Sequence, residues 1–207
     1  MGSEIIFIIA LIIAVALVYW IVLKSSAEKI ATQYQLLAAR FELALNQSAA
    51  KMRGFIRPEP SVYGIYRGRE MSISVPGKGL QNTRQIESVL KLELKGSQLS
   101  AQLTTAGPLG GLRQRDSRAQ ARWKSGDERF DQTVDVRTDH GGALASLLTA
   151  ERRMWLTSNL KKSKATLYIG GGNLAYAKFG LIADEATRED FEAAAEFLCD
   201  LAESIEA

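Results

Sequence analysis

The chain of 207 residues contains a single cysteine, Cys199, and a single histidine, His140. One cysteine excludes an intrachain disulfide and the paired-cysteine spacings of zinc fingers, and one histidine excludes a metal site with several histidine ligands. Cys199 lies among apolar and acidic residues that disfavour a thiolate, so we interpret it as a packing residue. The sequence pairs no serine or cysteine nucleophile with His140, which we interpret as a turn residue.

Motifs for cofactors and metals are also lacking. A metal site would have to use the carboxylates of Asp127, Glu128, Asp131 and Asp135, whose spacing is common on solvated segments. The run 170–173 (GGGN) lacks the Gly-Lys-Ser/Thr ending of a phosphate loop and lies between two strand-like segments, so it predicts a hairpin turn. We therefore expect no catalytic residue, no cofactor and no metal, with an unrecognised membrane-tethered enzyme as the alternative.

The most pronounced feature that is present is an apolar segment, 5–23, which carries no charged side chain. As a helix with about 1.5 Å of rise per residue it would reach about 28 Å, close to the thickness of a bilayer's hydrocarbon core. Tyr19 and Trp20 lie near its end, where aromatic rings favour the headgroup region, and the long stem of Lys24 can reach the same interface. The sequence predicts a tail, 1–4, and a transmembrane helix, 5–23, with these three residues as interface anchors.

The charges that flank this segment predict its orientation. Lys24, Lys29 and Arg40 follow the span, whereas the tail carries only the α-amino group and Glu4. The positive-inside tendency places the N-terminus outside and the following domain in the cytoplasm, at the inner (plasma) membrane of a bacterium. A cleaved secretory signal is the alternative, because the small residues at positions 25 and 27 have a permissible spacing, but the tail lacks basic residues and the apolar core is long.

A helical stalk is expected over 24–53, because residues 25–52 contain neither proline nor glycine. Its apolar residues recur at spacings of three and four: Ile30, Tyr34, Leu37, Phe41 and Ala44. Two alternatives stay open for this stripe. It packs on the protein's own domain, or its heptad-like spacing forms a coiled-coil homodimer.

A soluble α+β domain is expected over 54–207, since a glycine and two prolines at 54–60 end the stalk. Alternating apolar residues predict a mainly antiparallel sheet. Its expected strands are a hairpin at 62–66 and 71–75, a meander at 86–94 and 99–104, a strand at 130–136, and a second hairpin at 165–169 and 174–182. Two packed helices are expected, one at about 143–160 capped by Asp139, the other at about 188–205 behind a capping box of Thr187 and Asp190.

Charge is strongly segregated along the chain. From residue 184 onward nine acidic residues stand against Arg188 alone. The densest basic stretch is a candidate contact for an anionic partner and consists of Arg113, Arg115, Arg118, Arg122, Trp123 and Lys124. Near a membrane this stretch could bind acidic lipid headgroups or a small ligand. Nucleic acid is disfavoured as a partner, because no recognised motif accompanies the arginines and the acidic helix would oppose it.

Two short stretches carry a resemblance to a known group of proteins. They are VYGIYRGR from Val62 to Arg69 and RFD from Arg129 to Asp131, both downstream of the apolar segment. In this arrangement the chain resembles uncharacterised bacterial single-pass membrane-anchored proteins, a resemblance that implies an anchored domain and transfers no activity or catalytic residue. The function expected is a non-enzymatic protein-interaction or scaffold domain with a protein partner; the alternative is a membrane-proximal domain that senses lipid or a small ligand through 113–124.

Overall fold

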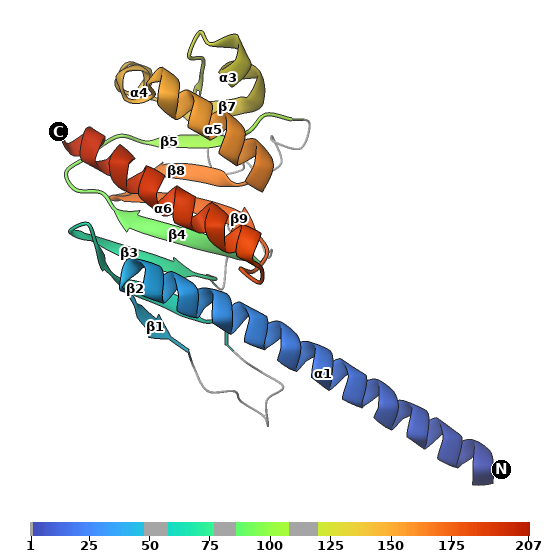
Figure 1. Ribbon diagram of the computed structural model, residues 1–207. Helices are drawn as coiled ribbons and strands as arrows, with labels where there is room; N and C mark the ends of the chain where they lie inside the picture. Colours follow the sequence, from blue (N-terminus) through green and yellow to red (C-terminus); the bar gives the residue numbers. More distant parts are fainter. Residues whose placement is uncertain (1, 48–57, 77–85, 108–119) are drawn as a thin grey trace.

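A computed structural model describes residues 2–47, 58–76, 86–107 and 120–207 of the chain (Figure 1). A long N-terminal helix leads into a nine-stranded sheet, on which further helices pack. Every pair of neighbouring strands in the sheet is antiparallel. The expected α+β class and mainly antiparallel sheet are therefore confirmed.

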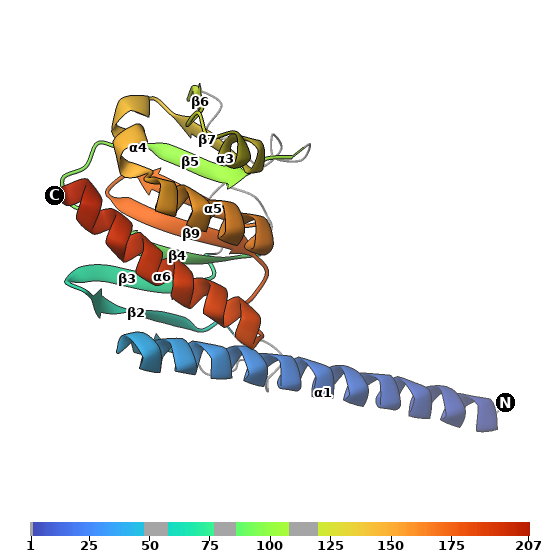
Figure 2. The same ribbon diagram turned by 45° about the horizontal axis from the view of Figure 1, so that its top comes forward.

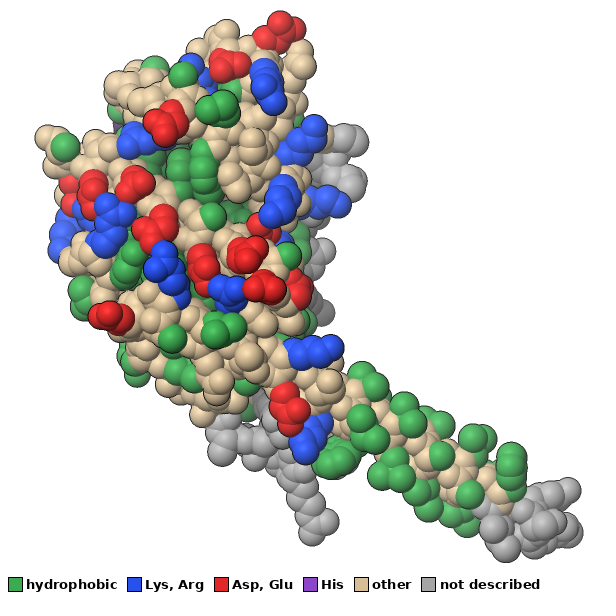
Figure 3. Space-filling model, in the orientation of Figure 1, with side chains coloured by type: hydrophobic (Ala, Val, Ile, Leu, Met, Phe, Trp, Pro, Cys, Tyr) green, Lys and Arg blue, Asp and Glu red, His purple; other side chains and the backbone are tan. Residues whose placement is uncertain are grey.

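Helix α1 runs without a break from Gly2 to Phe41. Its first half protrudes from the domain, and from residue 7 onward it is covered with hydrophobic side chains, as Figure 3 shows. Large side chains in this half are more than half exposed at most positions, for example Phe7 at 70% and Val18 at 62%. A core helix of a globular protein would bury such residues. By length and composition α1 is able to cross a membrane, and its apolar part is not buried in the domain.

The second half of α1 belongs to the core of the domain. Ile30, Tyr34, Leu37 and Phe41 are all buried, and the ring of Phe41 meets the ring of Tyr66 edge to face at 4.9 Å. Of the two alternatives for this apolar stripe, packing on the protein's own domain is therefore the one observed. A coiled-coil homodimer through the same stripe would first have to remove these side chains from the core.

The stalk is shorter than the range 24–53 expected from composition. Glu42 has a left-handed backbone, with φ of 55°, and the N–H of Leu43 donates to the carbonyl of Ala38 at 2.9 Å. The chain then enters strand β1, Ala44–Asn46, which pairs with strand β2, Ser61–Tyr66. Residue 44 thus lies on a strand although it continues the helical spacing, and residues 48–53 lie outside the described ranges.

Both predicted hairpins are confirmed. β2 turns into β3, Arg69–Ser74, through Arg67 and Gly68, which both have positive φ. β8, Thr166–Gly170, turns into β9, Asn173–Phe179, through Gly171 and Gly172, with φ of 60° and 73°. Positive φ at both central residues defines the turn that suits the right-handed twist of hairpin strands. The glycine run is thus a hairpin turn, as the sequence indicated.

The predicted meander is wrong in its pairing. β4, Glu87–Glu93, and β5, Ala101–Thr105, are not neighbours, because the hairpin of β8 and β9 lies between them. β4 pairs with β9 along its length, and β5 pairs with β8. The N–H of Leu94, just after β4, donates to the carbonyl of Gly172 in the turn at 2.9 Å. The strand order is β1-β2-β3-β4-β9-β8-β5-β7-β6.

The segment expected as one strand at 130–136 is divided between a helix and a strand. Asp127 caps a short helix, α3, Glu128–Thr133, and only then does the chain extend into β7, Val134–Thr138. Phe130 is buried although it lies on the helix, so its apolar side chain is no evidence for a strand at this position. The edge strand β6, Arg122–Trp123, pairs with β7.

The helix expected at 143–160 is interrupted. It consists of α4, Gly141–Leu147, and α5, Ala150–Ser163, because Thr149 begins a new helix by accepting a hydrogen bond from the N–H of Arg152. Asp139 does not cap α4. Its carboxylate accepts instead from the N–H of Ala121, at 3.3 Å.

The last helix, α6, Glu185–Glu206, has a different cap from the predicted box. Asp184 is the N-cap and accepts from the N–H of Thr187 at 2.7 Å, which lowers the pKa of its carboxyl. Asp190 binds Lys178 at 2.9 Å and Lys162 at 3.1 Å. The Asp190 carboxylate can bind those lysines because Asp184, not Thr187, caps the helix, so Asp190 takes no part in the cap.

One face of the sheet carries α5, α6 and the second half of α1 (Figures 1 and 2). The apolar residues of that face, such as Leu90, Leu103 and Tyr176, form one core with the three helices. The Tyr176 ring meets the Phe191 ring of α6 edge to face at 5.3 Å. α1 leaves the domain at one end, while α4 and the C-terminal end of α6 lie at the other (Figures 1 and 2).

Candidate functional site

The three predicted interface anchors lie together on α1. Tyr19 is 61% exposed and Trp20 is 40% exposed, and the ammonium of Lys24 lies 5.6 Å from the centre of the Trp20 ring. Lys24 also approaches Glu28, one turn further along, at 3.9 Å. Amphipathic rings and a lysine at the end of an apolar helix are typical of a membrane interface. Their contact with lipid remains a prediction.

The structure describes only part of the predicted basic stretch, since Arg113, Arg115 and Arg118 lie outside the described residues. Arg122 is exposed on β6 and pairs with Asp135 of β7 at 2.7 Å. Trp123 packs against the start of α4, where a Cβ added to Gly141 would lie 2.7 Å from its ring. Lys124 is exposed. In this part of the stretch the charge of Arg122 is paired and the ring of Trp123 is packed against α4. Binding of an anionic partner by the stretch remains a prediction.

The carboxylates considered for a metal hold local structure. Asp131 accepts from the N–H and hydroxyl of Ser125 and from the N–H of Gly126, at 2.9 to 3.1 Å. Asp135 pairs with Arg122 and Arg137. Within the described ranges, no three side chains of the metal-ligating types come together as a metal site would need.

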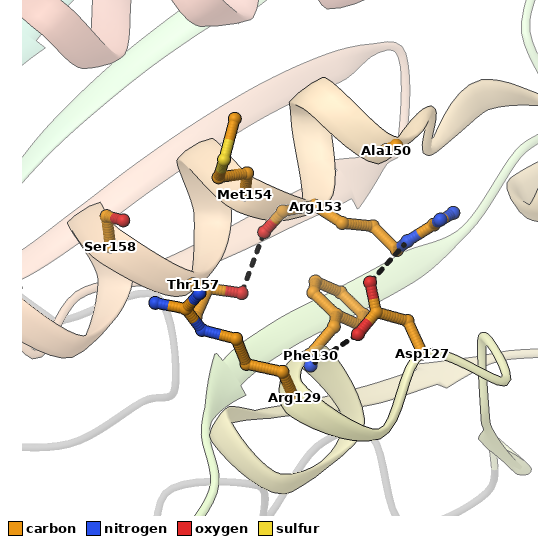
Figure 4. A pocket seen from close by; sticks show the side chains of 8 residues that line it. All are labelled: Asp127, Arg129, Phe130, Ala150, Arg153, Met154, Thr157 and Ser158. Carbon is orange, nitrogen blue, oxygen red and sulfur yellow. Dashed lines mark hydrogen bonds and ion pairs between the residues drawn. The ribbon is translucent and has the colours of Figure 1, made fainter.

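A small cavity of about 160 Å³ lies between α3 and α5 (Figure 4). Asp127 accepts from the N–H of Phe130 and from Nε of Arg153, at 3.2 and 3.3 Å, and these bonds lower the pKa of its carboxyl. Arg153 also donates to the carbonyl of Leu148 at 2.7 Å. Its charge and hydrogen bonds are thus used to fasten α3 to α5, and the cavity is a by-product of that junction.

A larger cavity of about 610 Å³ lies between the loop that follows β4, helix α4 and the C-terminal end of α6. Leu99, Leu147 and Ile205 line it with aliphatic carbon, while His140 and Arg152 contribute nitrogen. Sequence reasoning missed this site. Its residues come from segments that are far apart in the chain, and no local spacing indicates that they meet.

The acidic face of α6 is largely occupied by two arginines of the first hairpin. Arg67 pairs with Asp200 and with Glu203, both at 2.8 Å, and Arg69 pairs with Glu206. The hydrogen bond from Arg69, together with the N–H of Lys95, lowers the pKa of the Glu206 carboxyl. Figure 3 shows acidic and basic side chains interspersed over this face. The charge segregation seen along the sequence is therefore largely compensated in space.

The sole cysteine is a packing residue, and two apolar residues of β2 are exposed. Cys199 is fully buried in α6, and burial raises the pKa of its thiol to about 11, which suits packing better than nucleophilic attack. Tyr63 and Ile65 of β2, by contrast, are 53% and 63% exposed. Side chains alternate between the two faces of a strand, and Val62, next to Tyr63, is buried on the face that carries the helices. Tyr63 and Ile65 therefore point to the opposite face.

Comparison with known proteins gives one distant likeness. No protein-family model matches the chain, and a search of curated proteins finds no match. Among solved structures, the chain is similar to the crystal structure of the mycobacterial trehalose monomycolate transport factor A, TtfA, at 13% identity and a TM-score of 0.49, covering 82% of this chain and 96% of that one. A likeness this distant assigns neither a family nor a function.

Proposed function

We propose that the chain is a single-pass membrane protein whose α+β domain docks a second protein at the membrane surface and catalyses no reaction. The observation that carries this proposal is the continuity of α1, whose exposed apolar half runs directly into a half that is buried in the domain. Only about 10 Å of helix rise separates position 23 from Ile30, the first core residue. A partner would therefore meet a domain held close to the bilayer without a flexible linker.

The docking surface proposed is the outer part of the sheet at β2. Tyr63 and Ile65 expose apolar surface there, and β1 beside them is only three residues long. β1 pairs with Ser61–Tyr63 and is the edge of the sheet, so its outer side has no neighbouring strand among the described residues, whereas the chain at Leu43 lies against Gly64 of β2. A short edge strand beside exposed apolar side chains is a surface on which an extended segment of another protein can add as a strand.

Photo-crosslinking in intact membranes tests this surface. A photo-reactive residue at position 65 is expected to give a discrete adduct with a partner protein. The matched control is the same residue at position 154, because Met154 is equally exposed, at 64%, but lies on α5. Equal adduct patterns at both positions, or none at position 65 or 63, would count against docking at β2.

The proposed location is the inner membrane of a bacterium, with the N-terminus outside and the domain in the cytoplasm. Lys24 and Lys29, which follow the apolar segment, support this orientation. A reporter fused after Ala207 that is active only outside the cytoplasm would overturn it. Intact mass of the membrane-extracted protein tests retention of the anchor, since cleavage near position 27 would remove the first half of α1.

A further inference from the structure

The cavity of about 610 Å³ lies at the end of the domain opposite to the anchor. Two of the elements that line it are α4 and the C-terminal end of α6, which lie away from the side where α1 leaves in both views (Figures 1 and 2). Lipids of the bilayer that holds α1 are therefore remote from it. A ligand would enter from the aqueous phase.

Part of the cavity lining is aliphatic. Leu99 and Leu147 are 8% and 7% exposed, so each is a core residue that keeps a small accessible surface, and Ile205 of α6 adds a half-buried side chain. Cavities of roughly 300 to 1,000 Å³ with mostly apolar linings and a few polar groups are typical binding sites for small molecules. This cavity has that size, and its lining combines these aliphatic side chains with a similar share of polar groups, among them Ser97 and Gln98.

The charge of the lining is one-sided. Arg152 donates to the carbonyls of Leu147 and Asp200, at 2.8 and 3.2 Å, and to the hydroxyl of Ser204. All three acceptors are neutral, and no carboxylate in the described part of the chain pairs with this half-buried guanidinium, whereas its neighbour Arg153 is paired with Asp127. The described residues that line the cavity include no aspartate or glutamate. An anionic group would thus find a cation held in place and uncompensated.

We propose that this cavity binds a small amphipathic carboxylate, such as a medium-chain fatty acid. The alkyl chain would lie on Leu99, Leu147 and Ile205, and the carboxylate would accept hydrogen bonds from Arg152. The Nε of Arg152 donates no hydrogen bond to any described residue, so it is available to a carboxylate oxygen, and a hydrogen bond between charged groups is stronger than one between neutral groups. This ligand is independent of the protein partner proposed above.

The test uses the full chain in a non-ionic detergent and measures binding by titration calorimetry. The probes are octanoate and its neutral counterpart octanamide. We expect octanoate to bind saturably at one site and octanamide to bind at least tenfold more weakly. Shortening the ligand from octanoate to hexanoate should weaken binding by up to about 15-fold, since each buried methylene contributes about a factor of four.

Two variants connect the binding to this cavity. Ala143→Trp fills the cavity from the exposed face of α4, and we expect it to weaken both ligands at least tenfold; its control is Ala145→Trp, an exposed position on the same helix that does not line the cavity. Arg152→Gln should reduce octanoate to the affinity of octanamide and leave octanamide unchanged. If the Arg152→Gln variant fails to fold, comparison of Ala143→Trp with Ala145→Trp still shows whether the ligand binds in this cavity.

Three results would overturn the proposal. One is equal affinity for octanoate and octanamide, which would remove the role of Arg152. Another is equal binding by the Ala143→Trp and Ala145→Trp variants, which would place the ligand elsewhere. The third is uptake that never saturates, which would indicate partition into detergent micelles only. None of these results bears on docking of a protein at β2.

Discussion

Two neighbouring leucines of α1 allow a direct test of how this long N-terminal helix joins the domain. Leu37 is fully buried in the core, whereas Leu36 is 46% exposed on the outer side of the same helix. If α1 is part of the folded core, Leu37→Ala should lower the free energy of unfolding by about 3 kcal/mol, within a range of roughly 2 to 5. Leu36→Ala should change it by about 0.5 kcal/mol or less.

The size of the first effect follows from two contributions. Leucine to alanine removes three carbons from a site without solvent, which costs roughly 2 kcal/mol in lost transfer free energy at about 0.8 kcal/mol per methylene. The empty volume left among its neighbours costs the remainder, because a packed core relaxes only in part. At roughly 2 to 4 °C per kcal/mol for a domain of this size, the melting temperature should fall by about 6 to 12 °C.

Urea denaturation of the full chain in a mild detergent measures both effects. Tryptophan fluorescence is a suitable probe, because the ring of Trp155 stacks on Phe197 at 3.9 Å in the core of the domain and should change its emission on unfolding. Equal effects of the two substitutions would refute the burial of α1 in the domain. An effect of Leu37→Ala that depends on protein concentration would instead indicate that the stripe is buried in a dimer.

Five further substitutions test local features with the same denaturation assay. Gly171→Ala should cost about 1 kcal/mol, because Gly171 has φ of 60° and open space around it, while Gly171→Asn should cost less since asparagine tolerates the left-handed region. Arg69→Ala should cost about 2 kcal/mol, because this nearly buried guanidinium binds a charged group, while Arg67→Ala, at a more exposed site, should cost less than about 1. Asp184→Ala should cost about 1 kcal/mol at neutral pH. Because folding lowers the pKa of Asp184, its contribution is complete above the ordinary value of 3.8 and is lost as the pH falls through the folded pKa, so the difference from the parent chain should shrink in acid. A stability difference for Asp184→Ala that does not shrink as the pH falls below 3.8 would contradict the capping role, and a Gly171→Asn variant no more stable than Gly171→Ala would contradict the conformational reason.

The parts of the fold that could be predicted from the sequence are those set by neighbouring residues. Both hairpins are predicted by turn residues flanked by alternating apolar positions, because a hairpin involves only the turn and the two strands next to it in the sequence. The position of the hairpin of β8 and β9 could not be predicted. Leu92 pairs with Leu174, and Leu103 pairs with Leu167, across more than sixty residues, and alternation says nothing about which strand becomes a neighbour.

The candidate cavity could not be predicted from the sequence for a related reason. Leu99, Leu147 and Ile205 each read as ordinary core residues, and Arg152 reads as an ordinary residue on the polar side of a helix. Only the folded structure shows that the arginine's acceptors are neutral and that the three aliphatic side chains meet beside it. The sequence likewise shows the charge of the acidic C-terminal helix but not the two arginines, Arg67 and Arg69, that pair with it.

The change from exposed to buried apolar residues within α1 can be read from their period. Before position 24 the helix is apolar on all sides, which suits hydrocarbon, whereas from Ile30 onward apolar residues follow the helical period and cover one side only, which suits a sheet. The folded unit therefore begins inside this helix, not after residue 53. Four buried side chains of α1, each worth roughly 2 to 5 kcal/mol, together match or exceed the typical stability of a whole domain, about 5 to 15 kcal/mol. We therefore expect the domain to lose its fold when this half of the helix is released from the core.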